Sequence, residues 1–576
     1  MSEAAARSYE FEDFRIEVDK RLLFRQGKPV RLTPKAFDTL LLLVERKGEV
    51  ISKDDLMRAV WPDTAVEENN LNQNISTLRR VLGENRGENR YIATVPGQGY
   101  RFVPAVESSG FRQLTTEPVT VAVLPFANLS SDPDSEFFAD GVTEEIINAL
   151  AQIRNLRVVA RTSAFSFKGK QVDLRTVGTT LNAATLIEGS VRKSGDRVRI
   201  VAQLINAADG YHIWSERYDR EFQDIFEVQD EIARTIAARL KVTLGPDKPE
   251  TLVRSETKNL EAYQLYLKGR FHWNKRSADG LQKAIEYFRQ AIAKDASYAV
   301  AYAGLADAYN LMSFRNVLAP HAVMPKAKAA ATRALELDSN RAEAHVSLAY
   351  ASFTYDRNWP AAGRHFEQAK ALNPAFVMGH SFYPLYLSSR GRAEESISAA
   401  RRALELDPAS AAVSHVLAVQ LYLARFFDQA VEQCRQTLEL DPNYEPAFAV
   451  LGQVFSLTGQ YEEAVAQFEK SVAVTQRSSW ALALLGYAHA RSRARSHVME
   501  IIAALDTTSK GSFVPALCFA LIYAGLEEAD QAFAWLARAS DERHNRLAYI
   551  KVEALWDPLR SDPRFADLLR VFAIPD

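Results

Sequence analysis

The chain has 576 residues, of which 47% are hydrophobic and 25% are charged, and its formal net charge at pH 7 is −2. These values are ordinary for a folded protein of several domains, and they exclude a largely disordered or collagen-like chain. The near-neutral charge also excludes a protein that is basic throughout. Any nucleic-acid-binding surface therefore has to come from local clustering of Lys and Arg.

The chain shows no signs of export or membrane insertion. Its first residues are polar and acidic, unlike a secretion signal, and its longest apolar runs, 120–126 and 516–524, are much shorter than the ~20 residues that cross a bilayer. Cys434 and Cys518 are far apart and lack metal-ligand spacing, as expected in a reducing compartment. We expect a cytoplasmic protein without a membrane segment, cofactor or metal.

Short alternating segments around a QGKP turn open the chain and predict strands. Helical periodicity begins at Thr33-Pro34, where a capping hydroxyl precedes a proline at the first helical position, and it ends at Gly48. Ser52 then caps a second, shorter helix that ends before Pro62. These elements predict a small domain with strands followed by helices.

A third helix follows an acidic stretch, and its two faces differ in chemistry. Its inward stripe has helical spacing and consists of Leu71, Ile75, Leu78 and Leu82. The predicted outward side chains are amides, hydroxyls and guanidinium groups without a carboxylate: Asn72, Gln73, Asn74, Ser76, Thr77, Arg79 and Arg80. Such groups can form hydrogen bonds with base edges and phosphates, so this face suits the major groove of DNA.

Two alternating segments, 90–95 and 99–103, follow the third helix and flank Pro96-Gly97-Gln98, which predicts a β-hairpin. Residues 69–103 contain five Arg and two Glu, a local positive excess in a near-neutral chain. Tyr91, Tyr100 and Phe102 are interpreted as packing residues. The hairpin predicts a basic wing beside the polar helix.

Residues 8–105, with strands, three helices and the wing RYIATVPGQGYRFV, resemble the OmpR/PhoB-type winged helix in the arrangement of CadC- and ToxR-like regulators. The resemblance implies that the third helix enters the major groove, that the wing reaches the flanking minor groove, and that the loop from Trp61 to Glu68 can contact RNA polymerase or phosphate. Carried over by position, the base-reading candidates are Asn72, Gln73 and Ser76, the phosphate candidates Thr77, Arg79 and Arg80, and the wing candidates Arg90, Gln98 and Arg101.

Two departures from that family bear on regulation. Only about eight residues precede the winged helix, so we expect no receiver domain and no control by phosphorylation. The membrane span of CadC- and ToxR-like members is also missing. We therefore expect the regulatory input to be cytosolic.

Residues 106–118 are rich in Pro, Ser, Gly and Thr and are predicted to be a linker. Residues 119–244 alternate between strands and helices, which predicts an α/β domain, and they resemble the TolB-like domain in segments such as VAVLPFANLSSD and IEGSVRKSGDRVRIVAQLIN. We interpret Asp132, Asp134 and Glu136 as acids that cap a helix. Asp140, Glu144 and Glu145 are interpreted as that helix's exposed face. No catalytic motif is present, so we expect no enzymatic activity.

From residue 260 to 546 the chain is rich in alanine and helical, and Asn373, Asp407 and Asp441 recur at steps of 34 in similar motifs. Within one repeat, Gly452 and Ala464 are small where two antiparallel helices are expected to touch, and Phe455 and Phe468 are expected to fill the groove between neighbouring pairs. These residues resemble tetratricopeptide repeats, about eight units, followed by a helical cap at 547–576. The resemblance implies a protein or peptide partner on the concave face.

The sequence thus predicts three fold types in one chain: a winged helix (α+β), an α/β middle domain and an all-α tetratricopeptide-repeat solenoid. The leading interpretation is a one-component transcription regulator that binds double-stranded DNA as a dimer and is controlled through its α/β and repeat domains. One alternative is a scaffold for protein assembly that uses the winged helix for protein contacts. The other is a sensor of a small ligand bound in the α/β domain.

Overall fold

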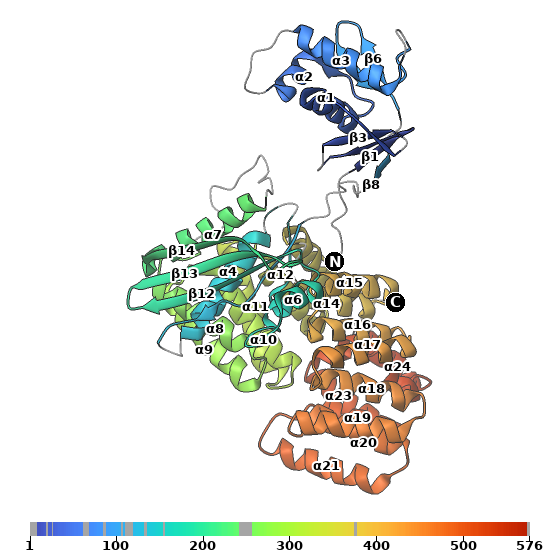
Figure 1. The fold of residues 1–576 in the computed structure, drawn as a ribbon. Helices are drawn as coiled ribbons and strands as arrows, with labels where there is room; N and C mark the ends of the chain where they lie inside the picture. Colours follow the sequence, from blue (N-terminus) through green and yellow to red (C-terminus); the bar gives the residue numbers. More distant parts are fainter. Residues whose placement is uncertain are drawn as a thin grey trace. The chain divides into compact units, whose positions relative to one another are not determined.

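The computed structural model divides into two compact units, Met1–Glu117 and Pro118–Asp576, which are described separately (Figure 1). The structure describes residues 8–18, 21–25, 27–61, 68–84, 88–104, 107–109, 119–131, 135–151, 153, 156–240, 256–373 and 377–572.

A five-stranded antiparallel sheet opens the first unit, in the order β4-β3-β2-β1-β8. Its strands are β1 (Ser8–Phe11), β2 (Phe14–Glu17), β3 (Leu22–Arg25), β4 (Lys28–Val30) and β8 (Glu107–Ser109). Strand β8 pairs with β1, Glu107 opposite Glu10, so part of the stretch predicted to be a linker belongs to this sheet. The backbone groups of β1 on the side away from β2 can pair with a segment that lacks strand-like alternation, which is why the sequence pattern missed β8.

Three helices and a hairpin complete this unit: α1 (Pro34–Glu45), α2 (Lys53–Val60), α3 (Glu68–Leu82), β6 (Ile92–Val95) and β7 (Gly99–Phe102), with β5 (Ile51–Ser52) paired to β7. Two predicted caps are confirmed, because the Thr33 hydroxyl accepts from Ala36 N at 3.3 Å and the Ser52 hydroxyl from Asp55 N at 3.1 Å. The predicted inward stripe of α3 is buried in a core whose described members all belong to this unit.

The second unit begins with a mixed sheet in the order β11-β9-β12-β13-β14, with β10 paired to β12. The strands are β9 (Val119–Val123), β10 (Ala127–Asn128), β11 (Leu156–Val158), β12 (Thr185–Ser194), β13 (Arg197–Asn206) and β14 (His212–Glu221). Its helices are α4 (Glu136–Ala151), α5 (Arg161–Phe165), α6 (Leu174–Thr180) and α7 (Ile225–Arg239), with a short 3-10 turn, η2 (Phe222–Asp224). Side chains at alternate positions of β9 enter separate apolar clusters, so both faces of the sheet are covered.

Helix α4 corrects one interpretation of the sequence. Asp140 is buried and Glu144 and Glu145 are partly buried, whereas all three had been interpreted as exposed. The helix packs against both α7 and the first repeat helix, α8, so it has little solvent-facing surface. Glu136 forms an ion pair with Lys168 at 2.6 Å, and the candidate acids Asp132 and Asp134 lie outside the described residues.

Sixteen helices, α8 to α23, form eight successive antiparallel pairs in which each pair contacts its neighbours (Figure 1). The close contact expected at Gly452 is present, because a Cβ there would lie 2.6 Å from the Phe468 ring. The helices are α8 (Leu260–Asn274), α9 (Ala278–Lys294), α10 (Ala299–Phe314), α11 (Pro320–Leu337), α12 (Ala342–Ala351), α13 (Trp359–Leu372), α14 (Val377–Ser389), α15 (Ala393–Leu406), α16 (Ala411–Leu423), α17 (Phe427–Leu440), α18 (Glu445–Leu457), α19 (Tyr461–Val474), α20 (Ser479–Arg491), α21 (Arg495–Ser509), α22 (Ala516–Gly525) and α23 (Ala529–Asp541), with a π-helical stretch, η3 (Ser352–Asp356), after α12.

The α/β region docks onto these repeats through buried polar contacts. Asp407, fully buried in the turn after α15, accepts from the backbone N of Ser163 in α5 at 2.8 Å and also from the Ser163 hydroxyl. The same hydroxyl accepts from Ala409 N at 2.8 Å. At a second place, Glu144 of α4 lies between Arg161, at 3.0 Å, and Arg270 of α8, at 2.6 Å. The α/β region and the repeats therefore form one unit.

After the last pair, the chain forms two 3-10 stretches and a helix: η4 (Asn545–Tyr549), η5 (Ala554–Leu559) and α24 (Pro563–Val571). The sequence predicted a helical cap here, yet η4 contacts α14 and η5 contacts α18 and α22. This segment therefore reaches helices far from the end of the stack. Among the residues that the structure describes, no helix combines the length and the apolar character that a bilayer-crossing segment needs.

Candidate DNA-binding interface

The exposed face of α3 carries the residues expected to read DNA. Gln73, Ser76 and Arg80 are exposed and lie at helical spacing, so they share one face of the helix. Asn72 is exposed too, and its Oδ1 accepts a hydrogen bond from the Tyr100 hydroxyl of the wing at 2.8 Å. This contact orients the Asn72 amide so that its NH₂ group is the donor, and the Asn72 side chain also forms a hydrogen bond with Glu68.

Two other α3 residues are less exposed than the sequence suggested. Asn74, placed in the outward set, faces α1 instead, where its Nδ2 donates to the Thr39 hydroxyl at 3.3 Å. Thr39 is fully buried, so Asn74 belongs to the helix–helix contact. Thr77, a predicted phosphate contact, is partly buried.

Arg79 joins α3 to the wing. Its Nη2 donates to the Ile92 carbonyl at 2.7 Å and to the Thr94 hydroxyl at 2.8 Å, both on β6. Its neighbour Arg80 is exposed, and its guanidinium group has no ion pair or hydrogen bond with a side chain or backbone group of the described residues. The two adjacent guanidinium groups, both predicted to bind phosphate, therefore have different surroundings.

The wing itself is built by close backbone packing. Gly99 adopts a φ of +150°, and a Cβ there would lie 1.9 Å from the Ile51 carbonyl oxygen of β5, so only glycine fits. Gln98, at the hairpin turn, and Arg101, on β7, are exposed as predicted. Tyr91, Tyr100 and Phe102 are buried, which confirms their interpretation as packing residues.

Arg90, predicted to lie on the wing, precedes β6 and contacts the N-terminal sheet. It forms an ion pair with Glu12, which also accepts from the Tyr91 hydroxyl at 2.6 Å. Hydrogen bonds from Tyr91 and Arg90 lower the pKa of Glu12, while burial and the Glu12 contact raise the pKa of Tyr91 to about 12. At the start of α3, Lys53 pairs with Glu68 at 2.5 Å. The rest of the predicted polymerase-contacting loop, residues 62–67, lies outside the described residues.

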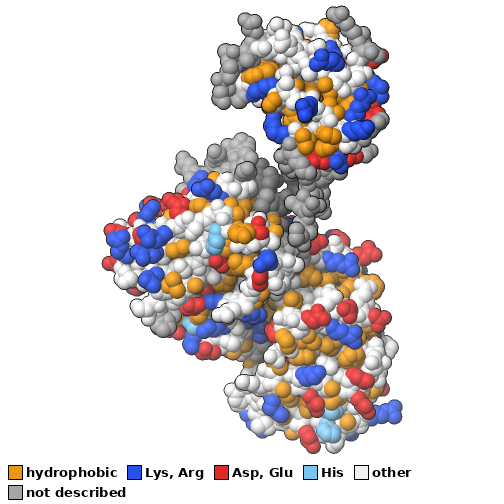
Figure 2. Space-filling view, in the orientation of Figure 1, with side chains coloured by type: hydrophobic (Ala, Val, Ile, Leu, Met, Phe, Trp, Pro, Cys, Tyr) orange, Lys and Arg blue, Asp and Glu red, His pale blue; other side chains and the backbone are white. Residues whose placement is uncertain are grey.

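The described interface thus combines exposed amide, hydroxyl and guanidinium groups on α3 with exposed Gln98 and Arg101 on the wing. Figure 2 shows several Lys and Arg side chains on the face of this unit that is in view. The sequence predicted this surface. It did not predict the hydrogen bonds from Tyr100 to Asn72 and from Arg79 to β6, because hydrophobic periodicity does not show which elements lie next to each other.

Comparisons with known proteins match three family models to separate parts of the chain. Residues 27–102 match "Transcriptional regulatory protein, C terminal", residues 117–235 match "HilA/YgeH-like transcriptional regulator, second domain", and residues 446–476 match "Tetratricopeptide repeat". The middle match is to the HilA-like domain, while the TolB-like resemblance stays a prediction.

Among curated relatives, putative adenylate cyclase 3 of Rhizobium meliloti is 36% identical over 258 residues, 44% of each chain. The transcriptional regulator HilA of Salmonella typhimurium is 29% identical over 412 residues, 70% of this chain and 72% of HilA. Among solved structures, the DNA-binding domain of Escherichia coli CadC is 30% identical, with a TM-score of 0.17, covering 18% of this chain and all of that domain. The chain spans less than half the length of the cyclase it matches.

The chain therefore carries an OmpR/PhoB-type winged-helix domain, a HilA-like second domain and tetratricopeptide repeats, and it is homologous to the transcriptional regulators HilA and CadC.

Proposed function

We propose that this chain is a sequence-specific DNA-binding transcription regulator in which α3 enters the major groove and the wing contacts the adjacent backbone. The observation that carries the proposal is the exposed α3 face of Gln73, Ser76 and Arg80, next to the wing. Asn72, Gln73 and Ser76 read bases in this proposal, and Thr77, Arg80, Gln98 and Arg101 contact phosphate or the minor groove. Arg79 and Arg90, which have partners within the protein, act as positioning residues.

The remaining parts of the proposal concern partners. The chain acts on DNA in the cytoplasm as a dimer, contacts RNA polymerase through the loop from Trp61 to Glu68, and takes its input from a partner on the repeats. It works by binding and not by catalysis. The charged cluster of α4 supports this last point, because Glu144 is engaged by two arginines. Mass photometry of the protein–DNA complex tests the dimer, since one chain per DNA site would contradict it.

DNA selection from a random-sequence duplex pool, using the full chain, tests sequence reading. We expect Gln73→Ala to relax the selected sequence at one base pair, by ~1–3 kcal/mol. Binding of the selected duplex is then measured at several salt concentrations. Arg80→Ala should make the slope of log K against log salt shallower by ~0.9, because one phosphate contact is lost.

The matched control is Arg435→Ala, which removes an exposed arginine from repeat helix α17 and should leave the slope unchanged. If Arg80→Ala and Arg435→Ala give the same slope as the parent chain, α3 does not contact phosphate as proposed. A selected pool without any consensus would contradict sequence-specific binding.

A further inference from the structure

The C-terminal tail, residues 542–572, lies on one face of the repeat stack. The first helices of successive pairs contact each other from α8 to α22. In this series, η4 packs on α14, and η5 packs on α18 and α22. We call the surface formed by these first helices the inner face. A terminal cap would contact only the last pair, whereas this tail extends along several pairs.

Apolar side chains of the tail fill the inner face. Leu555, Trp556 and Leu559 are each at most 3% exposed and share a core with residues of α20 and α22. Farther along, Tyr549 joins the core of the preceding repeats. The tail thus spans the boundary between the two cores of the stack, and its burial excludes another chain from that surface.

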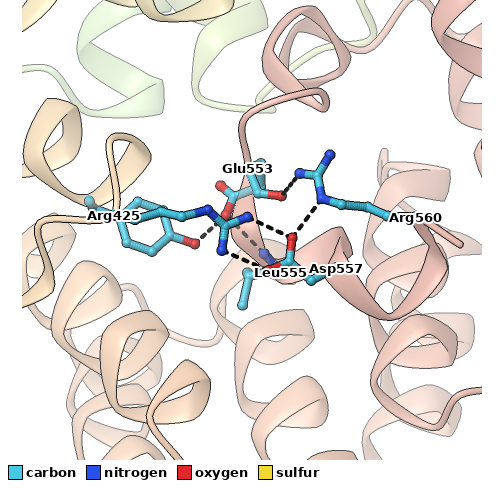
Figure 3. A network of polar contacts seen from close by, with 6 residues as sticks. Arg425, Glu553, Leu555, Asp557 and Arg560 are labelled. Atoms are coloured by element: carbon cyan, nitrogen blue, oxygen red, sulfur yellow. Dashed lines mark hydrogen bonds and ion pairs between the residues drawn. The ribbon is translucent and has the colours of Figure 1, made fainter. Parts of the chain in front are cut away.

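A network of polar contacts also binds the tail, next to its buried apolar side chains (Figure 3). Arg425, in the turn after α16, forms a bidentate ion pair with Asp557 at 2.7 and 2.8 Å, and Arg560 holds the same carboxylate at 2.6 Å. Glu553 is only 7% exposed and accepts hydrogen bonds from the Tyr422 hydroxyl and the Leu555 backbone N. Repeat residues thus bind two carboxylates of the tail, one of them buried.

Further contacts show how far the tail reaches. The Asn545 amide donates to the Tyr350 hydroxyl of α12 at 3.0 Å, and His544 contacts Asn316, after α10, at 3.0 Å. Arg357 donates to the Val571 carbonyl of the tail and to the Ser540 carbonyl near the end of α23, each at 3.1 Å. The tail follows the eighth helix pair in the sequence, yet its partners lie in earlier pairs. Asn316 belongs to the second pair, Tyr350 and Arg357 to the third, and Tyr422 and Arg425 to the fifth.

We propose that the inner face of the repeats is a peptide-binding site that the tail occupies in cis, and that its partner in trans is an acidic peptide. The chemistry of the contacts defines that peptide. It carries Leu-Trp for the apolar surface, an aspartate directly after them for Arg425, and a glutamate two residues before them for Tyr422. This proposal extends the partner role proposed for the repeats, and DNA binding plays no part in its test.

The test uses the full chain and a fluorescein-labelled peptide with the sequence of residues 551–562. A tethered tail competes at an effective concentration in the millimolar range, so the parent chain should bind the peptide weakly. Asp557→Ala weakens the tail and leaves the site intact, so peptide affinity should rise about ten-fold. Arg425→Ala weakens the tail equally but damages the site, so it should not gain affinity. Trp556→Ala provides a second tail-side variant.

Charge reversal sharpens the comparison. The Arg425→Asp chain should bind a peptide with Asp557→Arg and not the parent peptide. The matched control, Arg402→Ala, removes an arginine of similar exposure that pairs with Glu405 on the outer helix α15, and it should behave as the parent. Equal binding by the Asp557→Ala and Arg425→Ala chains, or binding by neither, would show that the tail is only a structural part of the repeats. Concentration-dependent dimers of Asp557→Ala would instead indicate tail exchange between two copies, which also overturns the proposal.

Discussion

Arg79 and Arg80 are adjacent in the sequence, yet their surroundings predict opposite effects on substitution. Arg79 makes two hydrogen bonds to β6, so Arg79→Ala should lower the free energy of unfolding of the winged helix by ~1–3 kcal/mol. It should weaken DNA binding at every salt concentration without changing the salt slope. Arg80→Ala should change the slope and leave stability within ~0.5 kcal/mol. Urea unfolding and salt titrations measure both effects, and equal stabilities of the two variants would contradict the positioning role of Arg79.

Glu145 predicts a pH dependence of stability. Burial, together with the neighbouring carboxylates of Glu144 and Glu256, raises its pKa to about 8, although Arg270 and Arg341 act in the opposite direction. Between pH 4.5, the ordinary pKa of a glutamate, and about pH 8, the folded chain therefore keeps a proton on Glu145 that the unfolded chain has released. Stability falls as the pH rises through this window.

Glu145→Gln removes the titration, so we expect a higher melting temperature at pH 8.5, by about 1–3 °C, and a smaller change at pH 5. Glu144→Gln is the contrast. Burial opposes its charge, but Arg270 and Arg161 outweigh burial and lower the pKa of Glu144. Its substitution should destabilise the chain at both pH values. The melting temperatures of both variants are measured at pH 8.5 and pH 5. If Glu145→Gln changes the melting temperature equally at both pH values, Glu145 does not titrate as predicted.

At the scale of elements, the docking of α5 onto the turn between α15 and α16 depends on Ser163 and Asp407. The backbone N and the hydroxyl of Ser163 both donate to the Asp407 carboxylate, and the hydroxyl also accepts from Ala409 N. Ser163→Ala or Asp407→Ala alone should therefore cost ~1–3 kcal/mol. Together they should cost less than the sum, because either change alone already removes the hydrogen bond between the Ser163 hydroxyl and the Asp407 carboxylate. A double-mutant cycle by urea unfolding measures this coupling, with exposed Thr179→Ala as the control. Additive effects would mean that the pair does not hold the two elements together.

The sequence predicted the features that depend on residues within one element, and it missed the features that depend on contacts between elements. The stripe of Leu71 and Ile75 follows from helical spacing alone, and both side chains are buried as predicted. Asn74 was misplaced because its contact with Thr39 depends on where α1 lies. Strand β8 pairs with β1 about 100 residues earlier, and Asn316 meets His544 228 residues later in the sequence. Such contacts depend on tertiary packing, which periodicity does not encode.

The candidate site shows the same division. Gln73, Ser76, Gln98 and Arg101 are exposed as predicted, because their exposure follows from their place in a helix or hairpin. The ties of Arg79 to β6 and of Tyr100 to Asn72 join elements that are separate in the sequence. The roles of these residues toward DNA stay predictions until the variants are measured.

At the scale of the whole molecule, the two units have separate hydrophobic cores. Among the residues that the structure describes, the buried members of the cluster around Ile75 all lie between Tyr9 and Phe102, and Ile232 belongs to a cluster that begins at Val121. Because each core is cooperative within itself, we expect at least two unfolding transitions in calorimetry of the full chain.

Ile75→Val should lower the temperature of one transition by about 5 °C, since a small cavity in a domain of about 100 residues costs about 1 kcal/mol. Ile232→Val should leave that transition in place and lower another by about 1 °C, because the same loss is spread over a larger unit. A single transition that shifts with both substitutions would mean that the two cores unfold together, and the winged helix would then report directly on events in the repeats.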